Sequence, residues 1–438
     1  MDLRTTIAAA VVAFGVSAAA SQLDLRSRAP APPVAAPTVP APAITADATY
    51  AALLDDLDRR IDGLQRRAGA RPDDWLIRMH LAATSLERAG LTGLVDDYER
   101  VQAVLDDAFA IAPQGSGPLL VAARFNFAVH RLDAAERHLD AIDRRAVPRA
   151  DEQAAARLLR AQIAMQRGQY DRALADLTVA ASASPATAGP ELALYHAKTG
   201  DPQQAAALLE QALAAADLKD PQRRAWLRLQ LAILAMDRGE QRDALQHLQR
   251  ADAELSGWWL VQEHIAEIYN RREQHAAAIE IYERLVPATD LPQHMDALAG
   301  LYRHTGRPRE ADELVARAAA RWQHYLARLP EAAIGHALQH YLQFGPPERA
   351  LELALADAAA RPGGDAQVAL ARAYLQVGRP ADALAVAEKL LASPYRSARL
   401  HDVAAKAHAA LGHAAEAERQ VELCLAINPR YTADDHAH

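Results

Sequence analysis

Residues 167–185 read RGQYDRALADLTVAASASP, and residues 411–429 read LGHAAEAERQVELCLAINP. In each stretch a glycine is followed five residues later by an alanine, and a proline ends the stretch. Glycine readily adopts the left-handed conformation that ends a helix, and the residues between it and the proline suffice for a second helix. Each stretch therefore predicts a helix end, a tight turn and a following helix.

The same pattern recurs along most of the chain. Nine alanines stand 32–39 residues apart, at Ala135, Ala173, Ala205, Ala244, Ala278, Ala311, Ala350, Ala383 and Ala417. Twelve residues before them, eight of nine positions are again alanine, and the ninth is Leu338. Five residues before them, seven of nine are glycine, with His130 and Glu273 as the exceptions. Paired small residues let two helices approach closely, and hairpins of this kind must stack to bury their faces.

The spacing predicts ten helical hairpins. Proline follows the turn glycine by two residues in four units, at Pro202, Pro308, Pro347 and Pro380, where it suits the first turn of a helix. The first hairpin is irregular, with Ala83 and Gly90 in its first helix and about six extra residues near 91–96. Two later units are longer by about five residues.

These features resemble the tetratricopeptide repeat family over residues 71–430. The resemblance rests on the ~34-residue period, the small residue in each helix, the turn glycine and the closing prolines of the two quoted stretches. It implies an all-α solenoid, a right-handed superhelix of about ten helix-turn-helix units. Most units lack the early tryptophan of the family.

The N-terminal residues predict export. Residues 1–20 carry one basic residue, Arg4, then an apolar alanine-rich run and small residues before Ser21, as in a signal peptide. A short uncleaved anchor is the alternative. Residues 21–46 form a linker rich in proline and alanine, which favours extended polyproline II.

Further segments flank the repeats. Residues 47–70 predict a capping helix, because Leu53, Leu57, Ile61 and Leu64 form an apolar stripe. Residues 431–438 form a short tail, and the last unit is expected to be polar outside or to contact something else.

Composition excludes several classes of protein. The net charge of −8 argues against nucleic acid as a partner, since phosphate binding needs a basic face. The single cysteine, Cys424, excludes an internal disulfide and a cysteine-rich zinc site, and its register favours a core position. We found none of the common nucleophile, P-loop, dinucleotide or zinc-protease motifs, so no catalytic residue and no cofactor is predicted.

Histidine is the unusual component, because thirteen of the seventeen lie after residue 240. His336 and His340 stand four residues apart, a helical spacing that can chelate a divalent metal if a third ligand is near. We interpret them as ordinary helical histidines and predict no metal site. A metal or small-ligand carrier that uses this histidine-rich half remains the alternative function.

The resemblance also implies which residues line the concave face. In the early units these are mainly apolar, namely Leu120, Phe127, Leu158, Met165, Leu194, Trp226, Leu229, Ile233 and Met236. They either hold an apolar partner segment or pack against neighbouring helices. In the later units they are polar, and the predicted protein-binding residues are Glu263, Glu267, Asn270, Arg271, Asp296, Arg303, Gln339, Arg372, Arg399, Asp402 and Lys406.

These expectations combine into one functional hypothesis. The chain is expected to be a non-catalytic scaffold of a bacterial cell envelope that binds protein partners in its groove. We expect a periplasmic or secreted protein, or one anchored in the inner membrane if the first segment is retained. In that second case the N-terminal segment would be its membrane contact.

Overall fold

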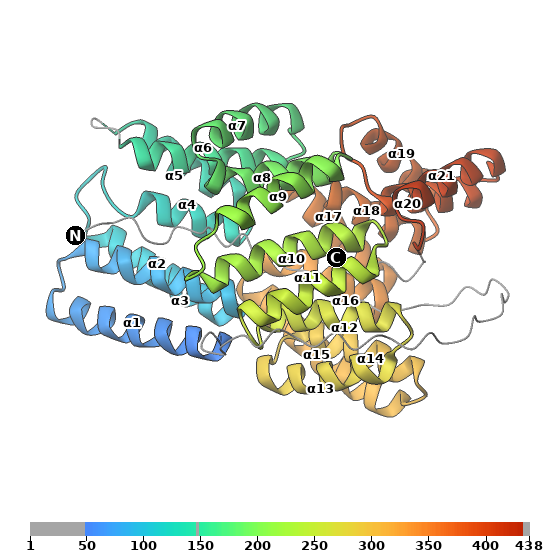
Figure 1. The fold of residues 1–438 in the computed structure, drawn as a ribbon, viewed down its shortest axis with the longest axis horizontal. Coiled ribbons are helices and arrows are strands. Elements are labelled where there is room, and N and C mark those ends of the chain that lie inside the picture. Colours follow the sequence, from blue (N-terminus) through green and yellow to red (C-terminus); the bar gives the residue numbers. More distant parts are fainter. Residues whose placement is uncertain (1–48, 146–148, 432–438) are drawn as a thin grey trace.

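A computed structural model describes residues 49–145 and 149–431, and within them the chain forms twenty-one α-helices (Figure 1). The expected signal peptide at 1–20, the linker at 21–46 and nearly all of the tail at 431–438 lie outside the described residues. The first eleven helices are α1 (Tyr50–Ala70), α2 (Trp75–Thr92), α3 (Val95–Ile111), α4 (Leu119–Ala128), α5 (Leu132–Asp143), α6 (Ala150–Gln166), α7 (Tyr170–Ala183), α8 (Pro185–Lys198), α9 (Pro202–Ala215), α10 (Pro221–Asp237) and α11 (Gln241–Glu254).

The remaining helices continue the same alternation. They are α12 (Trp259–Arg271), α13 (His275–Thr289), α14 (Pro292–His304), α15 (Pro308–Arg328), α16 (Pro330–Phe344), α17 (Pro347–Ala360), α18 (Gly364–Gln376), α19 (Pro380–Leu391), α20 (Ala398–Ala410) and α21 (Ala414–Ile427). From α2 onward each even-numbered helix packs against the next odd-numbered helix. The expected ten hairpins are thereby confirmed, and we number them one (α2–α3) to ten (α20–α21).

The paired small residues pack where the repeat predicts. In the first helices, the residues at the repeated alanine position are buried in all nine units, from Ala123 to Ala405. In the second helices, the eight alanines from Ala135 to Ala383 are 0% exposed, and Ala417 in the last helix is partly exposed. Any larger side chain at the covered positions would overpack the hairpin, which typically costs about 1–3 kcal/mol.

The turns follow the predicted left-handed geometry with one exception. Gly168, Gly200, Gly239, Gly306, Gly378 and Gly412 all have positive φ, and His130 and Glu273 adopt the same conformation where glycine is absent. Gly345 differs, with φ of −103° and ψ of 179°. It precedes Pro346, and a residue before proline is restricted to extended conformations.

The first hairpin also differs from expectation. The extra residues near 91–96 do not form a loop, because α2 continues to Thr92 and ends at Gly93, which has φ of 69°. Gly90 lies inside α2, the first helix of the hairpin, as expected, and is buried. Helix α1 packs on α2, and its N-terminus reaches hairpin six, where the amide of Tyr50 donates to the carbonyl of Ser256 at 2.9 Å.

The solenoid winds back onto itself. Figure 1 shows the green helices α8 and α9 beside the orange and red helices α17, α18 and α20. Direct contacts join these segments, since Lys198 after α8 lies 3.0 Å from Asp365 and its carbonyl accepts from the amide of Arg396 at 2.9 Å. The two halves of the array are therefore successive turns of one superhelix, packed edge to edge.

None of the helices within residues 49–145 and 149–431 combines the length and the apolar character that a membrane crossing requires.

Candidate functional site

Three of the predicted groove residues are buried. Glu263 and Glu267 on α12 are 2% and 8% exposed, and Asp296 on α14 is 2% exposed. The expectation of an open polar groove took no account of packing by other parts of the chain, which covers these three carboxylates. They do not belong to an accessible surface in this conformation.

Asp296 has a structural environment within the core. Its carboxylate accepts a hydrogen bond from Trp322 Nε1 at 2.8 Å and lies 2.7 Å from His340 Nδ1. Burial raises the pKa of Asp296, and the contacts with His340 and Trp322 oppose that shift. The carboxylate thus connects α14 with α15 and α16.

The carboxylate of Glu263 has fewer polar partners than that of Asp296. Among the described residues neither of its carboxylate oxygens has a hydrogen-bond partner, and His294 Nε2 lies 3.8 Å from one of them. The other ring nitrogen of His294 lies 2.8 Å from the hydroxyl of Thr289. An unpaired buried carboxylate of this kind destabilises the fold unless it is compensated.

The other eight predicted residues retain some exposure. Arg303 and Lys406 are exposed, whereas Asn270, Arg271, Gln339, Arg372, Arg399 and Asp402 are partly buried. Short contacts link the side chains within single hairpins or between neighbours: Arg271 with Glu267 at 3.0 Å, Arg372 with Gln339 at 3.3 Å, Lys406 with Asp402 at 2.7 Å and Arg303 with Asp312 at 3.0 Å. The structure arranges these residues as a row of pairs rather than as one cluster.

Arg372 is the most unusual cation of this row. Burial lowers the pKa of its guanidinium to about 10; Arg399 acts in the same direction, and Tyr431 and Asp402 oppose the shift. Its Nη1 donates to the neutral side-chain amide of Gln339. A carboxylate brought to this point would therefore stabilise the charged form of Arg372.

The histidines expected as a metal alternative have other contacts. His336 stacks on Trp322, with ring centroids 6.2 Å apart, and His340 contacts Asp296 as described. Both histidines are buried. Within the described ranges, no three or more His, Cys, Asp and Glu side chains are grouped so that they could hold a metal ion.

Some of the apolar residues expected on the concave face of the early units are buried by packing between helices. Phe127 is 5% exposed and packs with hairpins two and three, while Leu229 and Met236 are 1% and 0% exposed in the main core. For these three residues the packing alternative is correct. Cys424 is buried as its register predicts.

A line of contacts between the two superhelical turns was not anticipated. We call it the seam. It joins the turns of hairpins two, three and five to the first turns of α16 and α20 and to the link between α17 and α18. Its contacts are Arg131–Glu331 at 3.3 Å, His130–Arg361 at 3.1 Å, Gln166 O–Gly363 N at 2.8 Å, Tyr170 Oη–Gly364 N at 3.0 Å and Asp237–Arg399 at 3.8 Å. In the sequence, the dipeptide Gly363-Gly364 was the one sign of this close approach. A Cβ on Gly363 would lie only 2.8 Å from the carbonyl oxygen of Gln166.

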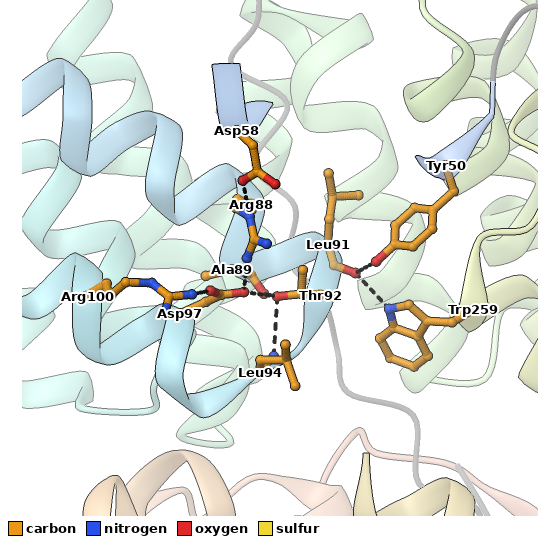
Figure 2. A network of polar contacts seen from close by, with 10 residues as sticks. All are labelled: Tyr50, Asp58, Arg88, Ala89, Leu91, Thr92, Leu94, Asp97, Arg100 and Trp259. Atoms are coloured by element: carbon orange, nitrogen blue, oxygen red, sulfur yellow. Dashed lines mark hydrogen bonds and ion pairs between the residues drawn. The ribbon is translucent and has the colours of Figure 1, made fainter. Parts of the chain in front are cut away.

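A separate set of polar contacts joins the first hairpin to α1 and to hairpin six (Figure 2). The carbonyl of Leu91, near the end of α2, accepts hydrogen bonds from Tyr50 Oη at 3.1 Å and from Trp259 Nε1 at 2.7 Å. Beside it the buried carboxylate of Asp97 accepts from Arg88, Thr92 and Arg100. This network fixes α1, α2 and α3 to one another and to α12.

Comparisons with known proteins concern the fold. No protein-family model matches the chain, and no curated protein sequence matches it. A tetratricopeptide repeat protein from Parabacteroides merdae is 15% identical with a TM-score of 0.35, over 57% of this chain and 96% of that chain. The human IFIT1 dimer with m7Gppp-AAAA is 15% identical with a TM-score of 0.41, over 85% and 94%. The APC/C assembly Cut9–Hcn1 is 15% identical with a TM-score of 0.45, over 87% and 72%.

The fold of this chain is assigned from its own structure, namely from the pairing of its helices and the burial of its small residues. Ten stacked hairpins, nine of which follow the alanine register with Leu338 as its one exception, and a left-handed residue in most turns agree with the pattern of the sequence. The chain has a tetratricopeptide-repeat-like α-solenoid fold.

Proposed function

We propose that this chain is a non-catalytic scaffold that binds an extended, acidic segment of a partner protein along the first helices of hairpins six to ten. The observation that carries the proposal is the placement of Arg372, a partly buried guanidinium that donates to the neutral amide of Gln339 at 3.3 Å. Burial and Arg399 lower its pKa, and Tyr431 and Asp402 oppose that shift. A partner carboxylate that hydrogen-bonds the guanidinium would stabilise its charged form further than Asp402 already does, which favours an anionic ligand.

The exposed charges of the same row support an acidic partner. Burial removes Glu263, Glu267 and Asp296 from the surface, and the groups that remain at least partly exposed are mostly cations and amides. The cations are Arg271, Arg303, Arg372, Arg399 and Lys406, and the one carboxylate among the predicted residues that stays partly exposed is Asp402. Four of these cations already pair with carboxylates of the chain, namely Arg271 with Glu267, Arg303 with Asp312, Lys406 with Asp402 and Arg399 with Asp237, so an acidic partner segment would compete for them.

We further propose that the scaffold acts in a bacterial envelope. Residues 1–20 have the pattern of an export signal, and the linker at 21–46 would hold the repeats away from a membrane if the first segment is retained. N-terminal sequencing of the protein recovered from cells distinguishes the two forms. A start near Ser21 indicates cleavage, and a start at Met1 indicates an anchor or a protein that is not exported.

The binding experiment uses the full chain as bait in envelope extract, cross-linked before capture. One variant reverses the charge of Arg303, Arg372 and Lys406, and a matched control reverses Arg137, Arg250 and Arg309, which are exposed outside the row. We expect a protein that the wild type and the control retain and the first variant loses. If all three baits retain the same proteins, the row is not the binding site, and if none retains any protein, the scaffold proposal fails. Circular dichroism checks that helicity is unchanged.

The metal or small-ligand carrier has less support. His336 and His340 are buried and already contact Trp322 and Asp296. No observation on the described residues favours this alternative over a protein partner.

A further inference from the structure

Arg124, on the first helix of hairpin two, is a partly buried arginine without a partner. Among the described residues its guanidinium forms no hydrogen bond and no ion pair. Burial lowers the pKa of Arg124 to about 10, with no opposing charge among the described residues. Its guanidinium nitrogens are not fully covered by the protein, so an anion from outside can reach them. An anionic ligand would stabilise a desolvated cation of this kind.

The repeat places Arg124 in the same register as Arg372. Each arginine stands one residue after the small residue of a first helix, Arg124 after Ala123 in hairpin two and Arg372 after Ala371 in hairpin nine. Gln339, to which Arg372 donates, occupies the same position in hairpin eight. By this register Arg124 belongs to the concave side of the superhelix, as the proposed binding residues of hairpins six to ten do.

The seam brings the helices of these two arginines end to end. His130, in the turn that follows α4, lies 3.1 Å from Arg361, which is the C-cap of α17. Gly364, the first residue of α18, donates its amide hydrogen to Tyr170 Oη at 3.0 Å in hairpin three. Helix α4 therefore ends on one side of the seam, and α18 begins on the other side.

Helix geometry gives the scale of the separation between the two arginines. Arg124 stands six residues before His130, and Arg372 stands eight residues after Gly364. At about 1.5 Å per residue these lengths are about 9 Å and about 12 Å, and the width of the seam adds to them. An extended chain advances about 3.4 Å per residue. A segment that contacts both arginines therefore needs more than about six residues between its two anionic groups.

Given the proposed function, in which Arg372 binds an acidic segment of a partner protein, we propose that this segment continues across the seam and places a second carboxylate at Arg124. The ligand is then a single chain with two acidic groups, separated by more than about six extended residues. Such a partner contacts both turns of the superhelix at once. Its affinity exceeds that of either contact alone, because the second contact forms at a high effective concentration.

The test measures binding of two fluorescein-labelled peptides of identical composition to the full chain by fluorescence anisotropy. Each peptide carries two pairs of glutamates in a glycine–serine sequence. The pairs are about ten residues apart in the long peptide and about two residues apart in the short peptide, so only the long peptide reaches both arginines. We expect the wild type to bind the long peptide at least about fivefold more tightly than the short one.

Three single substitutions assign the effect to the two arginines. Arg124→Gln should remove the advantage of the long peptide and leave the affinity for the short peptide unchanged. Arg372→Gln should weaken the binding of both peptides, because it removes the charge at which either is held. The matched control is Arg137→Gln on α5, an exposed arginine outside this register, which should change neither affinity.

The outcomes separate this inference from the proposed function. If both peptides bind the wild type equally, or if Arg124→Gln keeps the advantage of the long peptide, the contact at Arg124 is overturned, and weaker binding by Arg372→Gln still supports the proposed function. If neither peptide binds, or if Arg372→Gln weakens neither, both proposals fail.

Stability distinguishes a binding role of Arg124 from a structural one. Because its guanidinium has no partner among the described residues, Arg124→Gln should not lower the free energy of unfolding, as measured by urea denaturation. A clear loss of stability would show that Arg124 supports the packing of hairpin two, and it would overturn the proposal. Far-UV circular dichroism verifies that each variant is folded.

Discussion

The indole nitrogen of Trp259 lies 2.7 Å from the carbonyl oxygen of Leu91, and the two residues are 168 positions apart in the chain. The last carbonyls of a helix have no partner within it, and Leu91 stands one residue before the end of α2. Tyr50 donates to the same oxygen at 3.1 Å. One backbone carbonyl thus links the first helix, the first hairpin and the sixth hairpin.

Replacing Trp259 with phenylalanine should destabilise the fold. The substitution keeps an aromatic ring at a site that is 2% exposed and removes the donor to Leu91, so we expect a loss of about 1–2 kcal/mol in the free energy of unfolding. Urea denaturation followed by circular dichroism measures it. Trp226→Phe is the control for the change of ring size, since Trp226 is only partly buried. Equal losses in the two variants would show that the hydrogen bond contributes nothing.

A second prediction concerns two turn glycines with similar backbones. Gly239 has φ of 73° and Gly412 has φ of 80°, so alanine at either site incurs comparable backbone strain of about 1 kcal/mol. A Cβ on Gly239 would clash with the side chain of Asn428 across the seam, whereas nothing lies within 4 Å of one on Gly412. Gly239→Ala should therefore destabilise by at least about 1 kcal/mol more than Gly412→Ala, as measured by thermal and urea unfolding.

The companion variant isolates the contact across the seam. Combining Gly239→Ala with Asn428→Ala removes the clashing side chain, and the double variant should recover part of the stability. If the double variant loses the sum of the two single losses, the turn of Gly239 does not press on Asn428 in solution.

The hairpins were predictable from the sequence because their contacts are local. Ala173 and Ala161 meet within one hairpin, and the 34-residue period places their equivalents in the other units. The turn conformation followed from glycine for the same reason. Two departures from the repeat also have local causes. Pro346 restricts Gly345 to an extended conformation, and Gly93 ends α2 later than the repeat predicts.

The seam and the burial of the predicted site were not predictable in this way. Gln166 and Gly363 lie about 200 residues apart, and no repeated position marks either of them. The repeat register identifies the inner side of a helix but does not show what the next superhelical turn places there. Glu263 and Asp296 were assigned to an open groove for this reason, and the structure buries both.

The ion pair between Glu99 and Arg328 should respond to a charge exchange. Two hydrogen bonds of 2.6 and 2.9 Å join the carboxylate to the guanidinium, and the side chains are 26% and 55% exposed. Exposed pairs contribute little, so Glu99→Arg should cause a small but measurable loss, mainly from repulsion between the two guanidinium groups, and the exchange with Arg328→Glu should restore most of it. The loss should shrink in about 1 M salt, where charges are screened. A loss that is independent of salt would indicate packing rather than charge.

Acid should destabilise the seam through His336 and His130. Burial lowers the pKa of His336 to about 3, and Arg361 acts in the same direction. Burial, Arg361 and His336 likewise lower the pKa of His130 far below its ordinary value. Because unfolded histidine titrates near about 6.5, the stability that the neutral rings contribute is fully present above that pH and is lost as the pH falls toward 3.

We therefore expect the free energy of unfolding to decrease steadily from about pH 7 to about pH 4.5, and His336→Phe to flatten that decrease. Phenylalanine preserves the stacking of an aromatic ring on Trp322, whose centroid lies 6.2 Å from that of His336, and it cannot take up a proton. Urea denaturation at both pH values gives the difference, and His80→Phe at an exposed position is the control. If His336→Phe and His80→Phe change the pH dependence equally, burial beside Arg361 is not the cause, because His80 lies outside this environment.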